Sequence, residues 1–466
     1  MTHKVDVGQV RVSAILGGDI RLEASTYLRE GYGLVRLANQ VPGHVRLGDL
    51  ADIWQPSRLT GYEVPGGKGL PFLTAGQVFE DFPRVRKWLA KPFVPQVEKR
   101  YVDSGWLLLS CSGVVGRVTA VYPHHLGKVI THDLLRIVPN DPADYGWLYA
   151  YMKTDFFQKV ARAAQYGHMI KHIEVSHATE FPVIMPEEDT RREVTETARS
   201  AIRLRANAWE ARDQAFSLFE KSMSNGKSLH VTSHVEEEVR VSQVFDYRNR
   251  LDASTYCGVV RDAERLIDSR DIGILGNLVE KVFLSGRFAR PFGEGGVPFV
   301  TPSDLFDVNV KPTKRIYAKL VPNREQYILH EGELLMVRSG QKYGLLGRTM
   351  MVNSNQDGLF GSDDPIHIVP SVSLMRPGYL LTFLNDPLIG RPYVVRNAYG
   401  TSIPHLDVND IERLHVPRLG DEVENAIADL MEESIRLSAE ADRLEDKATN
   451  MAQEQIDAAI NSVSAD

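Results

Sequence analysis

The stretch GLPFLTAGQVF (69–79) recurs as GVPFVTPSDLF (296–306), and this recurrence decides the fold. Three further pairs keep the same order along the chain: VRVS at 10–13 and 239–242, RLEASTY at 21–27 with RLDASTY at 250–256, and Tyr166-Gly167 with Tyr399-Gly400. The offset between partners stays between 227 and 233 residues. Chance similarity does not keep such an order, and a drift of a few residues is typical of loop insertions in a shared fold. The chain therefore consists of two copies of one module.

Each copy has the pattern of an α+β module. Short β-rich runs bounded by Gly and Pro come first, as at 106–109, 114–121 and 134–138. An amphipathic helix follows near 147–164, and a strand-like run containing Pro closes the copy at 181–186. Strands and helices that mix without regular alternation favour an α+β fold over a doubly wound sheet.

A long helix with a seven-residue apolar pattern follows each copy, in the same register. We expect the two helices to form an antiparallel coiled coil, because the first must lead away from one module and the second must return. The alternative is that each helix packs separately on its own domain. The predicted seam residues are Val194, Ala201, Leu204, Ala208, Ala211, Ala215 and Leu218 in the first helix, and Val423, Ile427, Leu430, Leu437, Ala441, Leu444, Ala448 and Met451 in the second.

The predicted boundaries follow from these patterns. Module 1 covers 1–186, a spacer helix 187–225, a polar linker 226–238, module 2 239–418 and a second spacer helix 419–463. A helix of this length is a rod of roughly 55 Å. Two modules joined by such a rod would be held a fixed distance apart.

Composition limits the kind of protein. No run of 18 apolar residues and no apolar signal core occur, so we expect a cytoplasmic location. The two cysteines, Cys111 and Cys257, are too few for a disulfide framework or an all-cysteine zinc site. The net charge of −7 is concentrated at 419–466, which carry −10, whereas the first 418 residues carry +3. That balance permits a local basic surface without requiring one.

Catalytic motifs are missing. The sequence has no N-P-P-Y or D-P-P-Y motif, and Gly66-Gly67-Lys68-Gly69 lacks the other residues of a phosphate-binding loop. His168, His172 and His177 are spaced loosely enough for a metal site, but the second copy keeps only His405, so we interpret them as a polar loop. We expect a non-catalytic recognition protein with no metal and no cofactor of its own.

The ordered motifs of both copies resemble the specificity subunits of type I restriction-modification systems. In the first copy these are VRLGDLADI (45–53), GWLLLSCSG (105–113), YGHMIKHI (166–173) and FPVIMP (181–186); in the second, GNLVEKV (276–282), GELLMVRSG (332–340) and YGTSIPHL (399–406). The resemblance implies two target-recognition domains that each read one half of a bipartite double-stranded DNA site. It also implies that the paired helices dock two methyltransferase subunits, which bind S-adenosylmethionine, and that a separate motor-endonuclease subunit cuts. The weakly basic modules depart from this pattern and leave room for a related phage-defence system.

Candidate DNA-reading residues have cationic, amide or hydroxyl side chains in basic runs and Gly-rich loops. In module 1 they are Arg58, Lys68, Arg84, Arg86, Lys87, Ser112, His168 and Lys171; in module 2 they are Arg287, Arg290, Lys311, Lys314, Arg315, Arg338, Ser339, Gln341, Lys342, Tyr343, Thr401 and His405. For the basic runs, a solvated strand face is an equally good interpretation. The alternative functions are a protein-interaction scaffold with duplicated binding modules and an enzyme of an unrecognised kind.

Overall fold

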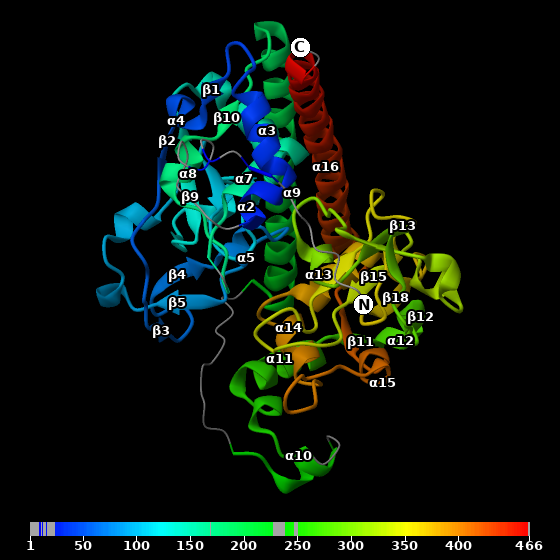
Figure 1. The fold of residues 1–466 in the computed structure, drawn as a ribbon. Helices are drawn as coiled ribbons and strands as arrows, with labels where there is room; N and C mark the ends of the chain where they lie inside the picture. Colours follow the sequence, from blue (N-terminus) through cyan, green and yellow to red (C-terminus); the bar gives the residue numbers. More distant parts are fainter. Residues whose placement is uncertain are drawn as a thin grey trace. The chain divides into compact units, whose positions relative to one another are not determined.

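The computed structural model describes residues 9–10, 12, 15, 24–167, 169–226, 238–246 and 250–464. Its contacts divide the chain into two compact units (Figure 1). Unit 1 contains Met1–Ala206 and Glu440–Asp466, and unit 2 contains Asn207–Ala439. Most of the predicted linker at 226–238 lies outside the described residues.

Unit 1 is built on an antiparallel sheet with the strand order β2-β9-β6-β7. Its strands are β2 (Ala51–Trp54), β6 (Leu107–Ser110), β7 (Val118–Ala120) and β9 (Leu134–Pro139). A second sheet has the order β3-β5-β4-β8, from β3 (Glu63–Val64), β4 (Leu70–Leu73), β5 (Lys87–Leu89) and β8 (Val129–Ile130), with β4 and β8 parallel. Strands β1 (Val45–Arg46) and β10 (Pro182–Val183) form a separate antiparallel pair. The apolar run of β6 is fully buried, as expected for an inner strand.

The helices of unit 1 surround these sheets. They are α2 (Ala24–Leu28), α3 (Glu30–Ala38), α4 (Leu47–Leu50), α5 (Ala75–Val78), α6 (Tyr145–Lys153), α7 (Asp155–Ala164), α8 (Val175–Thr179) and the first part of α9 (Glu188–Met223). The single helix expected near 147–164 is interrupted at Thr154. The Thr154 hydroxyl donates to the Tyr151 carbonyl at 2.6 Å and accepts from the Phe157 amide at 3.2 Å, so it ends one helix and caps the next.

Unit 2 repeats this topology. Its main sheet has the order β12-β18-β15-β16, a second sheet has the order β14-β13-β17, and β11 pairs with β19. The strands are β11 (Asp271–Ile274), β12 (Val279–Leu284), β13 (Phe292–Val300), β14 (Lys314–Ile316), β15 (Leu334–Met336), β16 (Thr349–Met351), β17 (Phe360–Gly361), β18 (Ile366–Pro370) and β19 (His415–Arg418). The helices are α10 (Val241–Asp246), α11 (Gly258–Asp268), α12 (Leu275–Leu278), α13 (Pro377–Asn385), α14 (Gly390–Val395), α15 (Val408–Glu412) and part of α16 (Asp421–Ser464). The predicted duplicated α+β fold is confirmed.

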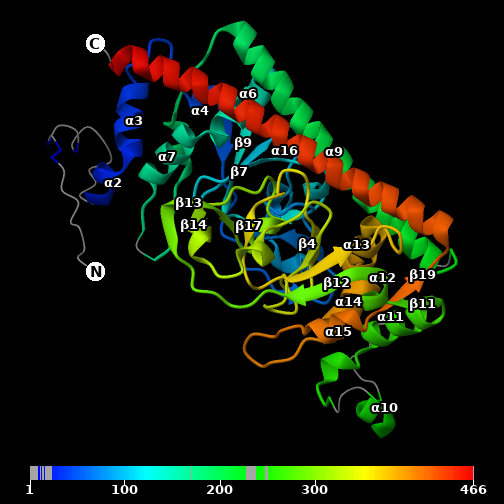
Figure 2. The ribbon, with the colours of Figure 1, turned by 90° about the vertical axis from the view of Figure 1, so that its right-hand side faces the viewer.

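In each unit, one part of α9 packs against one part of α16 (Figure 2). In unit 1 the Arg205 guanidinium pairs with the Asp442 carboxylate, and in unit 2 Arg212 Nε donates to Ser434 Oγ at 3.2 Å. Residue numbers rise along α9 as they fall along α16. The pairing is therefore antiparallel, as predicted.

On α9 the buried seam follows the predicted alanine ladder. Val194, Ala201, Ala208 and Ala215 are at most 2% exposed. The predicted companions Leu204, Ala211 and Leu218 are only half-buried, because the companion positions of the seam are one residue further along. Those positions are occupied by Arg205, Arg212 and Phe219.

On α16 one of the two predicted rows of seam residues is also displaced by one position from the row that is buried. Ile427, Ala441 and Ala448 are buried as predicted. The residues Val423, Leu430, Leu437, Leu444 and Met451 are half-buried, next to a buried ladder of Glu424, Met431, Ser438, Glu445 and Ala452. The physical reason is that charged side chains at buried positions find partners, so a pattern based on apolar residues alone misplaces the seam.

Candidate nucleic-acid interface

Three loops meet at one edge of the main sheet in unit 1. Because β2 and β6 both run antiparallel to β9, the ends of β2 and β6 and the start of β9 lie at the same edge. The loops that follow β2 and β6 and the loop that precedes β9 therefore come together there. They line a pocket of about 900 Å³, together with the segment after α7. The pocket residues that can hydrogen-bond are Gln55, Arg58, Thr60, Ser112, His132, Asp133, Tyr166, His172, Glu174 and Ser176.

The loop after β2 is fixed by hydrogen bonds from a buried guanidinium. Arg100 is fully buried, and its guanidinium donates to the Pro95 carbonyl at 2.9 Å and the Ser57 carbonyl at 3.0 Å. Gln55 Nε2 also donates to the His132 carbonyl at 2.7 Å. The neighbouring Arg58 is exposed and makes no hydrogen bond or ion pair with any described residue. A fixed loop thus presents a cation that is available to a ligand.

Burial favours the neutral form of two titratable groups in this pocket. Burial lowers the pKa of His132. Burial also raises the pKa of the Cys111 thiol to about 12, so this thiol stays protonated at neutral pH and is a poor nucleophile. Asp133 accepts a hydrogen bond from the Thr131 hydroxyl at 2.8 Å. The arrangement offers donors and acceptors, not an activated nucleophile.

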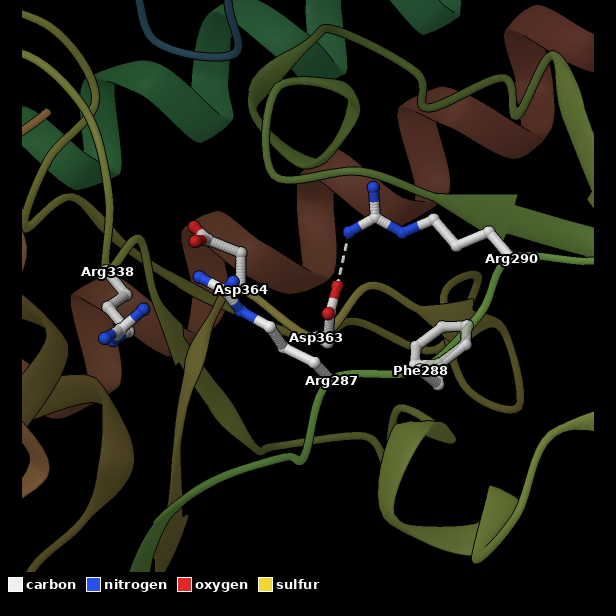
Figure 3. A pocket seen from close by; sticks show the side chains of 6 residues that line it. All are labelled: Arg287, Phe288, Arg290, Arg338, Asp363 and Asp364. Carbon is white, nitrogen blue, oxygen red and sulfur yellow. Dashed lines mark hydrogen bonds and ion pairs between the residues drawn. The ribbon is translucent and has the colours of Figure 1, made fainter.

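The equivalent edge of unit 2 carries a pocket of about 450 Å³, lined by Arg287, Phe288, Arg290, Arg338, Asp363 and Asp364 (Figure 3). Its loops again follow the first and third strands of the sheet order and precede the second. The Arg290 guanidinium forms an ion pair with Asp363. The side chains of Arg287 and Arg338 make no hydrogen bond or ion pair within the part of the chain that the structure describes. Figure 3 shows both of them beside Asp364.

The loop that carries Arg287 is anchored on the 3-10 helix Arg324–Tyr327 of unit 2. The Tyr327 hydroxyl donates to the Gly286 carbonyl at 2.7 Å, and the Ser285 hydroxyl donates to the Gln326 carbonyl at 2.8 Å. The Phe288 ring packs on the Tyr327 ring with centroids 4.5 Å apart. The cationic side chains therefore emerge from a rigid loop, which is what precise base recognition requires.

A polar chain connects this pocket to the Tyr399–His405 segment. The Ser339 hydroxyl donates to Asp364 Oδ1 at 2.5 Å, and its oxygen lies 2.7 Å from His405 Nδ1. Since the hydroxyl has a single proton, His405 Nδ1 is the donor in the second contact. Here the carboxylate contacts the serine and not the histidine, so the order differs from that of a hydrolytic triad.

The basic run in module 1 does not line the pocket, and two of its residues have carboxylate partners within the unit. One nitrogen of the Arg86 guanidinium contacts both carboxylate oxygens of Glu80, at 2.6 and 2.7 Å, and the Lys87 ammonium pairs with Glu63. The Arg84 guanidinium lies over the Phe82 ring, 5.3 Å from its centroid. Lys68 is exposed in the turn between β3 and β4. Arg86 and Lys87 therefore already have carboxylate partners within the unit, and contact of this run with DNA stays a prediction.

The remaining predicted residues lie in three places. Lys311, Lys314 and Arg315 are exposed around β14, where the Lys314 ammonium lies over the Phe292 ring and Arg315 Nε donates to the Gly296 carbonyl at 2.8 Å. Gln341, Lys342, Tyr343 and Thr401 lie in loops next to the unit 2 pocket, with Tyr343 74% exposed. Lys171 donates to the Gly167 carbonyl at 2.6 Å and so stabilises its own loop. His168 lies outside the described residues.

Sequence reasoning missed the acidic loop of each pocket. Asp133 and Asp364 belong to THDLLRIVP (131–139) and SDDPIHIVP (362–370), which are aligned at an offset of 231 residues. This further repeat could have identified both loops from the sequence alone. Among the described residues, no group of three or more His, Cys, Asp or Glu side chains could hold a metal ion, and no helix has the length and apolar character needed to cross a bilayer.

Comparison with known proteins gives structural matches only. No protein-family model matches the sequence, and no curated protein matches it significantly. The S subunit of a type I restriction-modification system from M. genitalium is similar over 91% of this chain and 96% of that chain, with 13% identity and a TM-score of 0.36. The HsdS subunit from Thermoanaerobacter tengcongensis is similar over 90% and 97%, with 14% identity and a TM-score of 0.26. A chain from a structure of complex assembly and conformational transition in the type I R-M system is similar over 91% of this chain and 98% of that chain, with 14% identity and a TM-score of 0.28.

Proposed function

We propose that this chain is a non-catalytic DNA-specificity subunit of a type I-like restriction-modification or related phage-defence system. It reads a bipartite double-stranded target with one module per half and docks methyltransferase subunits, which bind S-adenosylmethionine and carry out the methyl transfer. A motor-endonuclease subunit is the further partner in systems that restrict.

The observation that carries this proposal is the duplicated pocket at the same sheet edge of both units. The backbone frame is shared, whereas the side chains on it differ: Arg338 stands where module 1 has Cys111, and Asp363 stands where it has His132. One frame with two sets of hydrogen-bonding groups is suited to reading two different short sequences.

The chemistry of the unit 2 pocket favours a G·C pair. An arginine that makes no other ion pair can donate two hydrogen bonds to O6 and N7 of guanine, and a carboxylate can accept from N4 of cytosine. Arg338 and Asp364 supply these two functions on neighbouring loops. Module 1 offers Ser112 and the exposed Arg58, a different set of hydrogen-bonding groups for the other half.

Half-buried apolar side chains of α16 outside the buried seam support docking of a protein partner. The half-buried Leu430, Leu437, Leu444 and Met451 recur every seven residues and are not part of the buried seam. The segment that carries them has a net charge of −10, which disfavours contact with DNA phosphates. An apolar ladder in an acidic surround is typical of a protein-binding face.

The test is to map methylated bases in cells that express the chain together with the methyltransferase encoded beside it. Cells with the methyltransferase alone are the control. We expect one motif with two short specified halves and an unspecified spacer, present only when both proteins are made. A methylation pattern that does not depend on this chain would overturn the proposal.

A further inference from the structure

Both units hold a short loop against their candidate site by the same backbone hydrogen bonds. In unit 2, Tyr399 and His405 exchange two of these bonds, at 3.0 and 2.7 Å, and close the loop between them. The Gly340 amide then donates to the Pro404 carbonyl at 3.1 Å, and the Leu406 amide donates to the Arg338 carbonyl at 2.9 Å. We name residues 399–405 the tip loop of unit 2. It is fixed at both ends to the loop that carries Arg338.

The corresponding segment of unit 1 is Tyr166–His172, the tip loop of unit 1. Tyr166 and His172 exchange two backbone hydrogen bonds of 2.9 Å. The Gly113 amide donates to the Lys171 carbonyl at 3.0 Å, and the Ile173 amide donates to the Cys111 carbonyl at 3.0 Å. The two loops are thus anchored in the same way, although they are separated by 233 residues.

Each tip loop exposes an isoleucine at the same position. Ile170 is 57% exposed and Ile403 is 56% exposed. A single exposed apolar residue is ordinary on a protein surface. Here the same β-branched residue recurs on two loops that are anchored by equivalent backbone hydrogen bonds, and each loop adjoins a cluster of hydrogen-bonding groups.

Ile170 lies beside groups that we propose to read base edges, and Ile403 lies on a loop that is hydrogen-bonded to such groups. Ile170 lines the unit 1 pocket together with Arg58 and Ser112. In unit 2 the tip loop ends at His405, which hydrogen-bonds to Ser339, and Ser339 in turn binds the pocket residue Asp364. A ligand that reaches the polar groups of either pocket therefore also meets the tip loop.

The pocket chemistry decides which apolar group of DNA the isoleucine meets. The combination of guanidinium and carboxylate suits the major groove, where guanine acceptors and the cytosine amino donor are both presented. The apolar group on that surface is the 5-methyl group of thymine. Insertion between stacked bases is the other use of such a residue, and it belongs mainly to proteins that bind the minor groove.

We propose that Ile170 and Ile403 each pack against the methyl group of a thymine in the half-site that their own module reads. The inference rests on the proposed function. It adds a residue that determines specificity to each module and predicts a thymine on one strand of each half.

The experiment tests each change in the DNA with each variant of the protein. Duplex oligonucleotides carry the mapped target, and each thymine of each half is replaced singly by deoxyuridine, which removes only the methyl group. Binding of the full complex is measured for the unaltered chain, for Ile170→Ala and Ile403→Ala, and for Val372→Ala. The last removes a 71% exposed apolar side chain of unit 2 that lies outside the tip loop.

We expect one deoxyuridine in each half to weaken binding of the unaltered complex roughly three- to fivefold, as burial of one methyl group would predict. Ile403→Ala should abolish this effect in the half read by module 2 only, Ile170→Ala in the other half only, and Val372→Ala in neither. Half-sites without thymine, or an equal deoxyuridine effect in all variants, would overturn the proposal. So would an increase in 2-aminopurine fluorescence at the contacted step, because this would indicate insertion between bases. If the complex shows no preference for the target duplex, it is the proposed function that fails.

Discussion

Replacing Arg205 with methionine should destabilise unit 1 strongly at high pH and much less at low pH. Arg205 is 2% exposed and forms an ion pair with Asp442, which is 8% exposed. Tyr122, Glu445 and Asp81 also face this pair. Removal of one member of a buried ion pair costs about 3–5 kcal/mol, because the other charge is left without a partner.

The pH dependence follows from the Asp442 carboxyl. Burial raises its pKa to about 6, against an ordinary value near 3.9. A carboxyl with a raised pKa binds more protons in the folded state than in the unfolded state between these two values. Its contribution to stability is therefore fully present below about pH 4 and is lost as the pH rises through about 6, a difference of roughly 3 kcal/mol. In Arg205→Met the Asp442 carboxyl can bind a proton at low pH, and this removes the free-energy cost of an unpaired buried charge.

The assay is urea unfolding of the full chain, followed by far-ultraviolet circular dichroism at about pH 8 and about pH 5. Arg205→Met should lose about 3–5 kcal/mol at the higher pH and clearly less at the lower one. The double variant Arg205→Met/Asp442→Leu should recover most of the loss, since two apolar side chains need no partner. Arg203→Met is the control, because Arg203 is exposed on the same helix. A loss that is equal at both pH values, together with a double variant no better than the single one, would refute this reasoning.

Three further predictions concern individual residues. Arg86→Ala should lower the free energy of unfolding by about 1–3 kcal/mol, because it leaves the buried Glu80 carboxylate without this partner, and should leave the mapped methylation motif unchanged; a motif altered at one base pair would return Arg86 to the reading surface. Ala441→Asp, at a fully buried seam position, should cost several kcal/mol in urea unfolding, whereas Leu437→Asp at a half-buried position should cost much less; equal losses would contradict the observed register. Arg338→Ala should weaken binding by about 1–3 kcal/mol and relax specificity at one base pair of one half-site, as measured by competition with single-base variants; uniform weakening across all variants would indicate a phosphate contact instead.

The fold was largely predictable because the sequence is duplicated. Two copies with the same order of motifs impose one topology twice, and repeated apolar positions predict two long helices. The helix near 147–164 was predicted in one piece, because its break depends on a single capping hydroxyl, that of Thr154. Apolar periodicity shows no such local hydrogen bond.

The seam and the site were only partly predictable, for a common reason. Arg205, Asp442 and Glu445 occupy buried positions that an apolar pattern assigns to other residues, and they are stabilised there by partners far away in the sequence. Conversely, the sequence alone shows Arg86 and Lys87 as cations without known partners, whereas in the structure they form ion pairs with Glu80 and Glu63. The role of a charged side chain can be assigned only when its partner is known.

The central claim is that the two modules read DNA independently. The direct measurement is the methylation motif of a chain in which residues 239–418 are replaced by a second copy of residues 1–186, expressed with the same methyltransferase. We expect one half of the motif to stay as it was and the other half to acquire the same base sequence as the first. A motif in which both halves change, or in which neither changes, would contradict it.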